Sequence, residues 1–155
     1  MISSDELRTL LQSNETFRVE RTTSINDMDK FQEAICAFSN DLPDSRKNGY
    51  LILGATDNGA LSGLKVDDAL MKKISAIRSN GNILPLPVMC VERFEFPEGD
   101  LLVAEVSPSL LPPVRYRGRV LSESARAATS QARRRNAYSQ NAAPPTWPLS
   151  MPRHV

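Results

Sequence analysis

The 155-residue sequence contains one histidine and two cysteines, and this scarcity excludes several kinds of site. The histidine, His154, is the next-to-last residue, which argues against His-based catalysis and against a His-rich metal site. Cys36 and Cys90 are far apart and lack the spacing of metal ligands or of a redox pair. Both lie in apolar runs, so we expect buried thiols in a reducing cytosol.

Long apolar runs are also missing. No stretch approaches the roughly 18 residues that a membrane span needs, and the region after Met1 lacks a signal-peptide core. We therefore expect a cytoplasmic protein without a membrane partner. A Walker-type phosphate loop is absent too, because Gly54, Gly59 and Gly63 have the wrong spacing for one.

The composition is ordinary for a globular protein, with 41% hydrophobic and 24% charged residues. A chain of this length forms about one domain and can bury a core without disulfides. The charge is uneven: residues 1–120 carry 14 Lys/Arg and 17 Asp/Glu (−3), whereas residues 121–155 carry five Arg and one Glu (+4), for the total of +1. Binding of nucleic acid would therefore need a local basic patch.

Apolar residues recur at helical spacing in three segments. The first follows Ser3, the second follows Asn26 or Asp27, and the third covers residues 66–78 with Asp67 near its start. Alternating or fully apolar runs predict strands at residues 17–22, 50–53, 86–96, 101–106 and 114–121. We predict an α+β domain over residues 1–121, with about three helices around a mixed, mostly antiparallel sheet.

Residues 122–155 differ from the rest, with no glycine, no sustained periodicity and one acidic residue. One interpretation is a basic, disordered, non-globular tail. The other is a frameshift product, caused by loss of one G after the codon for Leu121. Under one compatible set of codons, restoring that base continues the strand as Arg-Val-Leu-Val-Arg-Val-Gly and adds a Glu-rich helix. The coding DNA around codon 121 decides between them.

Several of these segments together resemble the Schlafen-type AlbA-like domain, a nucleic-acid-binding domain of bacterial regulators and Schlafen proteins. The matching segments are the strand with Val19 and Glu20, AICAFSN at 34–40, LILGATDNG at 51–59, Ser62-Gly63-Leu64, and PVRYRGRV at 113–120. The resemblance covers about Glu15 to Leu121 and implies the fold predicted above. Two features depart from the family: Arg21-Thr22-Thr23 follows Glu20 where the family often has a lysine shortly after the glutamate of the first strand, and the loop at 40–49 is longer and more polar. The family's usual Arg-Val-Gly after the last strand is also absent, but it occurs in the restored frame.

The first functional hypothesis is binding of DNA or RNA. Arg115, Arg117 and Arg119 alternate along one predicted strand, which would place three guanidinium groups about 7 Å apart on one face. Tyr116 would point the opposite way into the core. Arg18 and Arg21 could add charge nearby. The alternative interpretation is an exposed strand face that charge keeps soluble.

The second hypothesis is a metal-dependent endoribonuclease, which the resemblance implies because some Schlafen proteins cleave RNA with two Glu and one Asp. Glu15, Glu20 and Asp57 match that pattern, and together they could hold Mg²⁺ or Mn²⁺. No cofactor is predicted otherwise. The alternative interpretation is that Asp57 only starts an Asp-Asn-Gly turn and that Glu15 lies in a distant loop.

A third hypothesis is an interaction or sensory module, since such domains often precede a helix-turn-helix or an ATPase region. An exposed edge strand could also pair with another copy and give a homo-oligomer. The sequence leaves the choice between DNA and RNA open.

Overall fold

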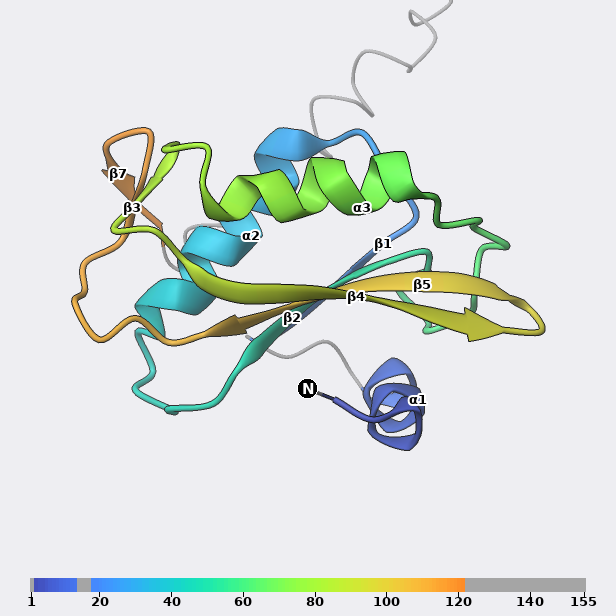
Figure 1. The fold of residues 1–155 in the computed structure, drawn as a ribbon. Helices are drawn as coiled ribbons and strands as arrows, with labels where there is room; N and C mark the ends of the chain where they lie inside the picture. The colour runs from blue at the N-terminus through green and yellow to red at the C-terminus, as the bar shows by residue number, and fades with distance from the viewer. Residues whose placement is uncertain (1, 14–17, 122–155) are drawn as a thin grey trace, which may run out of the picture.

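The computed structural model describes residues 2–13 and 18–121 (Figure 1). Its helices are α1 (Ser4–Gln12), α2 (Met28–Asn40), α3 (Asp68–Ser75) and the short 3-10 helix η1 (Ala76–Arg78). Its strands are β1 (Val19–Thr22), β2 (Gly49–Leu53), β3 (Ile83–Leu84), β4 (Val88–Phe96), β5 (Gly99–Ser107), β6 (Arg115–Tyr116) and β7 (Arg119–Val120).

Each α-helix begins where a short polar side chain caps its first turn. Ser3 accepts a hydrogen bond from the Glu6 N–H at 3.2 Å, and the Glu6 carboxylate accepts one from the Ser3 N–H at 2.8 Å, which completes a capping box. Asp27 caps α2 and Asp67 caps α3 in the same manner. The predicted starts of all three helices are confirmed.

Four strands form the main sheet in the order β1-β2-β5-β4. β1 runs parallel to β2, and the other two pairings are antiparallel. β4 and β5 form a hairpin that turns at Pro97 and Glu98. The predicted α+β class with a mixed, mostly antiparallel sheet is confirmed.

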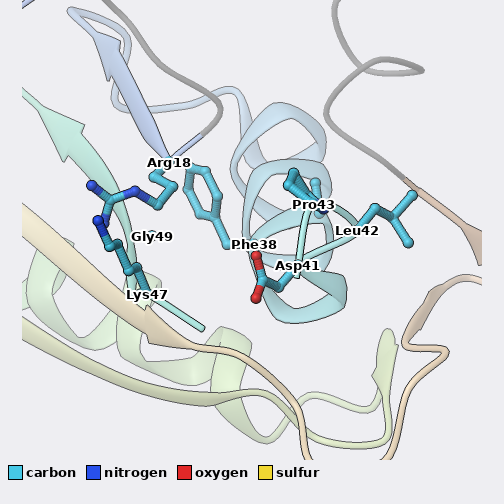
Figure 2. Close-up of a pocket in the computed structure, with 8 residues that line it drawn as sticks. Arg18, Phe38, Asp41, Leu42, Pro43, Lys47 and Gly49 are labelled. Atoms are coloured by element: carbon cyan, nitrogen blue, oxygen red, sulfur yellow. The ribbon is translucent and has the colours of Figure 1, made fainter. Parts of the chain in front are cut away.

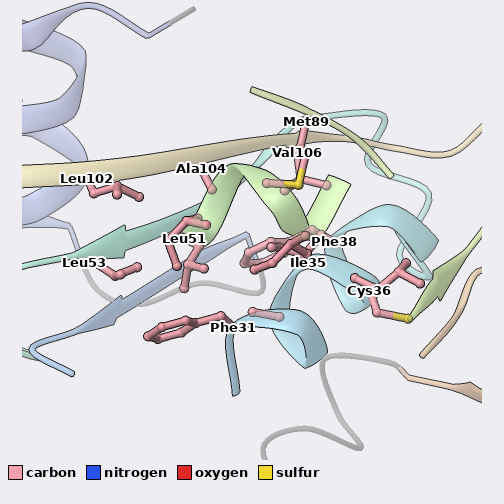
Figure 3. Close-up of a cluster of buried hydrophobic side chains, with 14 of the residues drawn as sticks. Phe31, Ile35, Cys36, Phe38, Leu51, Leu53, Met89, Leu102, Ala104 and Val106 are labelled. Atoms are coloured by element: carbon pink, nitrogen blue, oxygen red, sulfur yellow. The ribbon is translucent and has the colours of Figure 1, made fainter. Parts of the chain in front are cut away.

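The main sheet lies between two apolar clusters, because neighbouring residues of a strand point to opposite faces. α2 and α3 cover one face, where Phe31 and Ile35 pack against Leu51 and Val106 (Figure 3). α1 covers part of the other face and packs against Ile52, Phe94 and Val103, among others. Figure 1 shows this layering, with α2 and α3 above the sheet and α1 below it.

Residues 114–121 form a hairpin, so the prediction of a single strand there is wrong. The hairpin is part of a second sheet with the order β3-β6-β7. Arg117 and Gly118 make its two-residue turn with φ angles of 46° and 81°. Turns with positive φ at both central residues match the twist of the flanking strands. The chain reverses at this turn, so the alternating sequence of residues 114–121 does not correspond to alternating faces of one strand.

Two expectations concern residues outside the described ranges. The tail and frameshift hypotheses concern residues 122–155, which lie outside these ranges. The endoribonuclease hypothesis needs Glu15, which lies outside them too. The domain boundary after Leu121 therefore stays a prediction. Within the described ranges, none of the helices has the length and apolar character that crossing a membrane requires.

Candidate nucleic-acid interface

Asn40, the last residue of α2, holds both ends of the β6–β7 hairpin. Its side-chain oxygen accepts a hydrogen bond from the Val114 N–H at 2.7 Å. Its amide nitrogen donates to the carbonyl oxygens of Val114 and Leu121, both at 2.9 Å. Val114 precedes the first strand of the hairpin and Leu121 follows the second, so one buried side chain fixes the hairpin against α2.

Asp29 attaches the middle of the hairpin to the first turn of α2. The Tyr116 hydroxyl donates a hydrogen bond of 2.6 Å to the Asp29 carboxylate, and the Arg117 guanidinium lies 3.6 Å from the same oxygen. Burial, together with the hydrogen bond to Asp29 and its charge, raises the pKa of Tyr116 to about 12. Tyr116 is thus a core residue, as predicted.

The three hairpin arginines do not share one face, which corrects the expected linear array. Arg115 pairs with Val120, whereas Arg119 pairs with Tyr116, and directly paired residues project from the same face of a sheet. Arg115 and Arg119 therefore belong to opposite faces, and Arg117 lies at the turn between them. All three side chains are exposed, so the hairpin presents cations in several directions.

Arg115 and Arg119 keep their charge uncompensated within the part of the chain that is described. Arg115 donates a hydrogen bond of 3.4 Å to the carbonyl oxygen of Gly118, and neither arginine pairs with a carboxylate there. Arg117 differs, because Asp29 partly neutralises it and its guanidinium also stacks over the Tyr116 ring at 5.2 Å. The hairpin is a compact basic feature on a domain whose residues 1–120 carry a net charge of −3.

Arg18 lies apart from the hairpin, at a small pocket between the end of α2 and the loop that follows it. Figure 2 shows Arg18 and Lys47 at this pocket with Phe38 and Asp41. Arg18 is half-buried and donates a hydrogen bond of 3.3 Å to the Asn48 carbonyl oxygen. A contribution of Arg18 to nucleic-acid binding stays a prediction.

Arg21 has a structural position, which corrects the expectation that it adds surface charge. Only 2% of the residue is exposed. Its guanidinium donates to the carbonyl oxygens of Leu11 at 2.7 Å and Ser13 at 3.0 Å, at the end of α1. The last carbonyl groups of a helix have no partner within the helix, and a buried cation there satisfies them.

The acidic residues of the endoribonuclease hypothesis lie in different surroundings. Glu20 is an ion-pair partner of Lys30 on α2, at 3.1 Å. Asp57 is exposed in a turn after β2, two residues before Gly59, which packs against the Leu11 carbonyl at the end of α1. No three His, Cys, Asp or Glu residues of the described ranges form a group that could hold a metal ion. Glu15 is outside those ranges, so the hypothesis stays a prediction.

The two thiols differ in environment. Cys36 is buried, donates to the Val114 carbonyl oxygen at 3.4 Å, and has a pKa that burial raises to about 11. Cys90 is only partly buried and lies 3.9 Å from the Glu105 carboxylate. Burial, followed by the charge of Glu105, raises the pKa of Cys90 as well. Neither environment favours the reactive thiolate.

The model of the family described as Schlafen, AlbA_2 matches residues 15–139. This chain belongs to the Schlafen AlbA_2 family. The match continues past Leu121, the last described residue. The resemblance inferred from the sequence motifs is therefore confirmed.

The AlbA_2 fold of this chain is also similar to a solution NMR structure. That structure is the N-terminal domain of a RecG-related protein from Nitrosomonas europaea, named after an ATP-dependent DNA helicase. The identity is 22%, the alignment covers 70% of this chain and 74% of that one, and the TM-score is 0.50. A search of curated proteins finds no match.

Sequence reasoning missed the residues that position the hairpin of this AlbA_2 domain. Asn40 is in the AICAFSN motif, but its partners Val114 and Leu121 are 74 and 81 residues away. Asp29 reads as an ordinary first-turn acid of α2. The available signal was a polar residue at the end of an apolar helix, since buried polar groups are nearly always hydrogen-bonded.

Proposed function

We propose that this AlbA_2 domain binds nucleic acid through the phosphate backbone and that the β6–β7 hairpin makes the contact. The observation that carries the proposal is that a five-residue segment of a fixed, exposed hairpin contains three arginines, Arg115, Arg117 and Arg119. Arginine presents a planar fork of donors that matches phosphate oxygens. Such contacts supply most of the sequence-independent affinity for nucleic acid.

The position of the hairpin suits this role. Asn40 fixes its backbone on α2 and Asp29 fixes the Tyr116 side chain, so little backbone entropy is lost when the arginines meet phosphates. Arg115 and Arg119 project from opposite faces, which favours contacts with more than one phosphate. The mild acidity of residues 1–120 confines attraction to this local feature.

The relatives support the same proposal. The Schlafen AlbA_2 family matches most of the chain, and the structural neighbour is a domain of a protein named after a DNA helicase. We also propose that this binding serves regulation and not catalysis.

A binding assay with the full chain tests it. Fluorescence anisotropy measures the affinity for a labelled DNA duplex and for a labelled RNA of equal length. Replacing all three hairpin arginines with glutamine should weaken binding by at least about tenfold, because two or three charged contacts are lost. Arg8→Gln is the matched control, because Arg8 is an exposed arginine on α1, which covers the other face of the main sheet (Figure 1). Equal affinity of the triple variant and the full chain would refute the hairpin as the contact.

A further inference from the structure

The large apolar side chains exposed on the described residues gather at one end of the molecule. They are Leu42, Leu84, Leu86, Val88, Leu110, Leu111 and Val120, with exposed fractions from 42% to 96%. We call this set the apolar end. Val120 is in β7 of the hairpin and Leu42 lines the pocket beside Arg18, whereas the other five residues lie outside the sites described above.

Strand pairing brings the two longest parts of the apolar end together. Leu84 ends β3, Leu86 lies in the connection to β4 and Val88 begins β4, while the connection from β5 to β6 carries Leu110 and Leu111. The pairs Leu84–Arg115 and Val88–Ser107 join these connections at both ends. The connections therefore run side by side between the two sheets, as Figure 1 shows at the left of the molecule.

The remaining two residues border the same surface. Val120 pairs with Arg115, so Leu84, Arg115 and Val120 form one row across the small sheet. Leu42 follows α2 where the Ser109 N–H donates to the Ser39 carbonyl oxygen at 2.8 Å. The stem of Arg115 adds apolar area to this row, while its guanidinium bonds to Gly118.

We infer that the apolar end is the contact surface of a homodimer, with a second copy of this chain as its occupant. Full burial of a valine or leucine removes on the order of 100 Å² of apolar surface, so the exposed parts of the seven side chains offer roughly 450 Å². A standard interface buries about 800 Å² on each partner, of which about 60% is apolar. The apolar end therefore supplies nearly the whole apolar area that a stable dimer needs.

The 25 residues that directly follow Leu121 do not suit this surface. Leu121 ends the described part beside Val120, so residues 122–146 start next to the apolar end. Those residues include only one large apolar side chain, Tyr138. The apolar side chains of this surface can, by contrast, pack against the same side chains of a second copy, as the two-fold interface of identical chains requires.

Sedimentation velocity of the full chain at about 1 to 100 μM tests the inference. The expected result is a mass that rises from 17.2 kDa towards twice that value as concentration increases. The double variant Leu110→Ser/Leu111→Ser should raise the dimer dissociation constant at least about tenfold, and Lys72→Ser on α3 should leave it unchanged. Leu110 is 96% and Leu111 is 73% exposed, so their replacement preserves the fold.

Three outcomes would overturn the inference. One is a monomer over the whole concentration range. Another is a dimer that the double variant does not weaken, which places the interface elsewhere. The third is a monomer in which the double variant shifts the emission of Trp147, the only tryptophan, because that result assigns the apolar end to the chain's own C-terminal residues.

Discussion

The side-chain amide of Asn40 pairs with the backbone of Val114 through two hydrogen bonds, of 2.7 Å and 2.9 Å. An amide side chain presents a donor and an acceptor side by side, so it pairs with the N–H and C=O of one residue much as a neighbouring strand does. The pairing joins the end of α2 to the start of the β6–β7 hairpin. The AICAFSN and PVRYRGRV segments are therefore two halves of one structural unit.

Replacement of Asn40 should destabilise the domain and weaken binding together. Asn40→Ala leaves the buried Val114 N–H without its acceptor, removes the side-chain donor to the Leu121 carbonyl, and leaves the Val114 carbonyl with only the weak Cys36 thiol donor. The cost should be about 3 kcal/mol in the free energy of unfolding. Urea denaturation measures this cost. Asn58→Ala, in an exposed turn, is the control and should cost less than about 0.5 kcal/mol. Similar values for the two variants would contradict the role given to Asn40.

Arg21 should matter for stability and not for phosphate binding. Arg21→Met removes the donors to the carbonyl oxygens of Leu11 and Ser13 and should lower the free energy of unfolding by about 2 kcal/mol. Binding of nucleic acid by the folded variant should keep the salt dependence of the original chain. If the variant binds nucleic acid with a reduced salt dependence and its stability is unchanged, Arg21 contacts phosphate and the structural role given to it is wrong.

Alkaline pH should weaken the fold through Tyr116. Its pKa in the folded protein is raised to about 12, above the ordinary value of 10, so the folded state retains a proton that the unfolded state releases. The stability that Tyr116 contributes is complete below pH 10 and is lost as the pH rises through 12. At pH 11 the loss amounts to about 1.4 kcal/mol.

The comparison with Tyr116→Phe isolates this effect from other groups that titrate at high pH. Urea denaturation at pH 8.5 and pH 11 should show a larger drop for the original chain than for the variant. Equal drops would mean that the Tyr116 hydroxyl is not held by Asp29 as described.

Two glycines with similar backbone angles should differ sharply in their tolerance of alanine. Gly59 and Gly63 have φ angles of 84° and 80°, so the conformational cost of alanine is about 1 kcal/mol at both. A Cβ atom at Gly59 would collide with the Leu11 carbonyl oxygen, whereas a Cβ at Gly63 meets nothing within 4 Å. Gly59→Ala should therefore lower the free energy of unfolding by about 3 kcal/mol, because it pushes α1 away from the turn. Thermal or urea unfolding of the two variants checks this, and equal losses would refute the contact.

Local signals were sufficient to predict the helices and the main sheet. Ser3 and Glu6 specify the start of α1 without distant partners, and the Pro97-Glu98 turn between two alternating runs specifies the β4–β5 hairpin. The same alternation gave a wrong answer at residues 114–121. The two-residue turn interrupts the strand without interrupting the alternating sequence, and Arg117 is an unusual residue at φ 46°.

Contacts between distant segments were beyond the reach of sequence patterns. Arg21 alternates with apolar residues as a surface side chain would, but α1 covers it. Asn40 lies at the end of a helix as a polar residue ordinarily does, but its partners come from the other end of the domain. Neither position carries a local preference that reveals its partner, so the arginines of the candidate site were identified while the residues that position them were not.

The salt dependence of nucleic-acid binding tests the central claim most directly. For a DNA duplex, each neutralised phosphate contributes about −0.9 to the slope of log K against log salt concentration. Replacing Arg115, Arg117 and Arg119 with glutamine should reduce the magnitude of this slope by about two, since Asp29 already partly neutralises Arg117. Arg8→Gln should leave the slope unchanged. An identical slope for the triple variant and the original chain would contradict the claim that the hairpin binds the phosphate backbone.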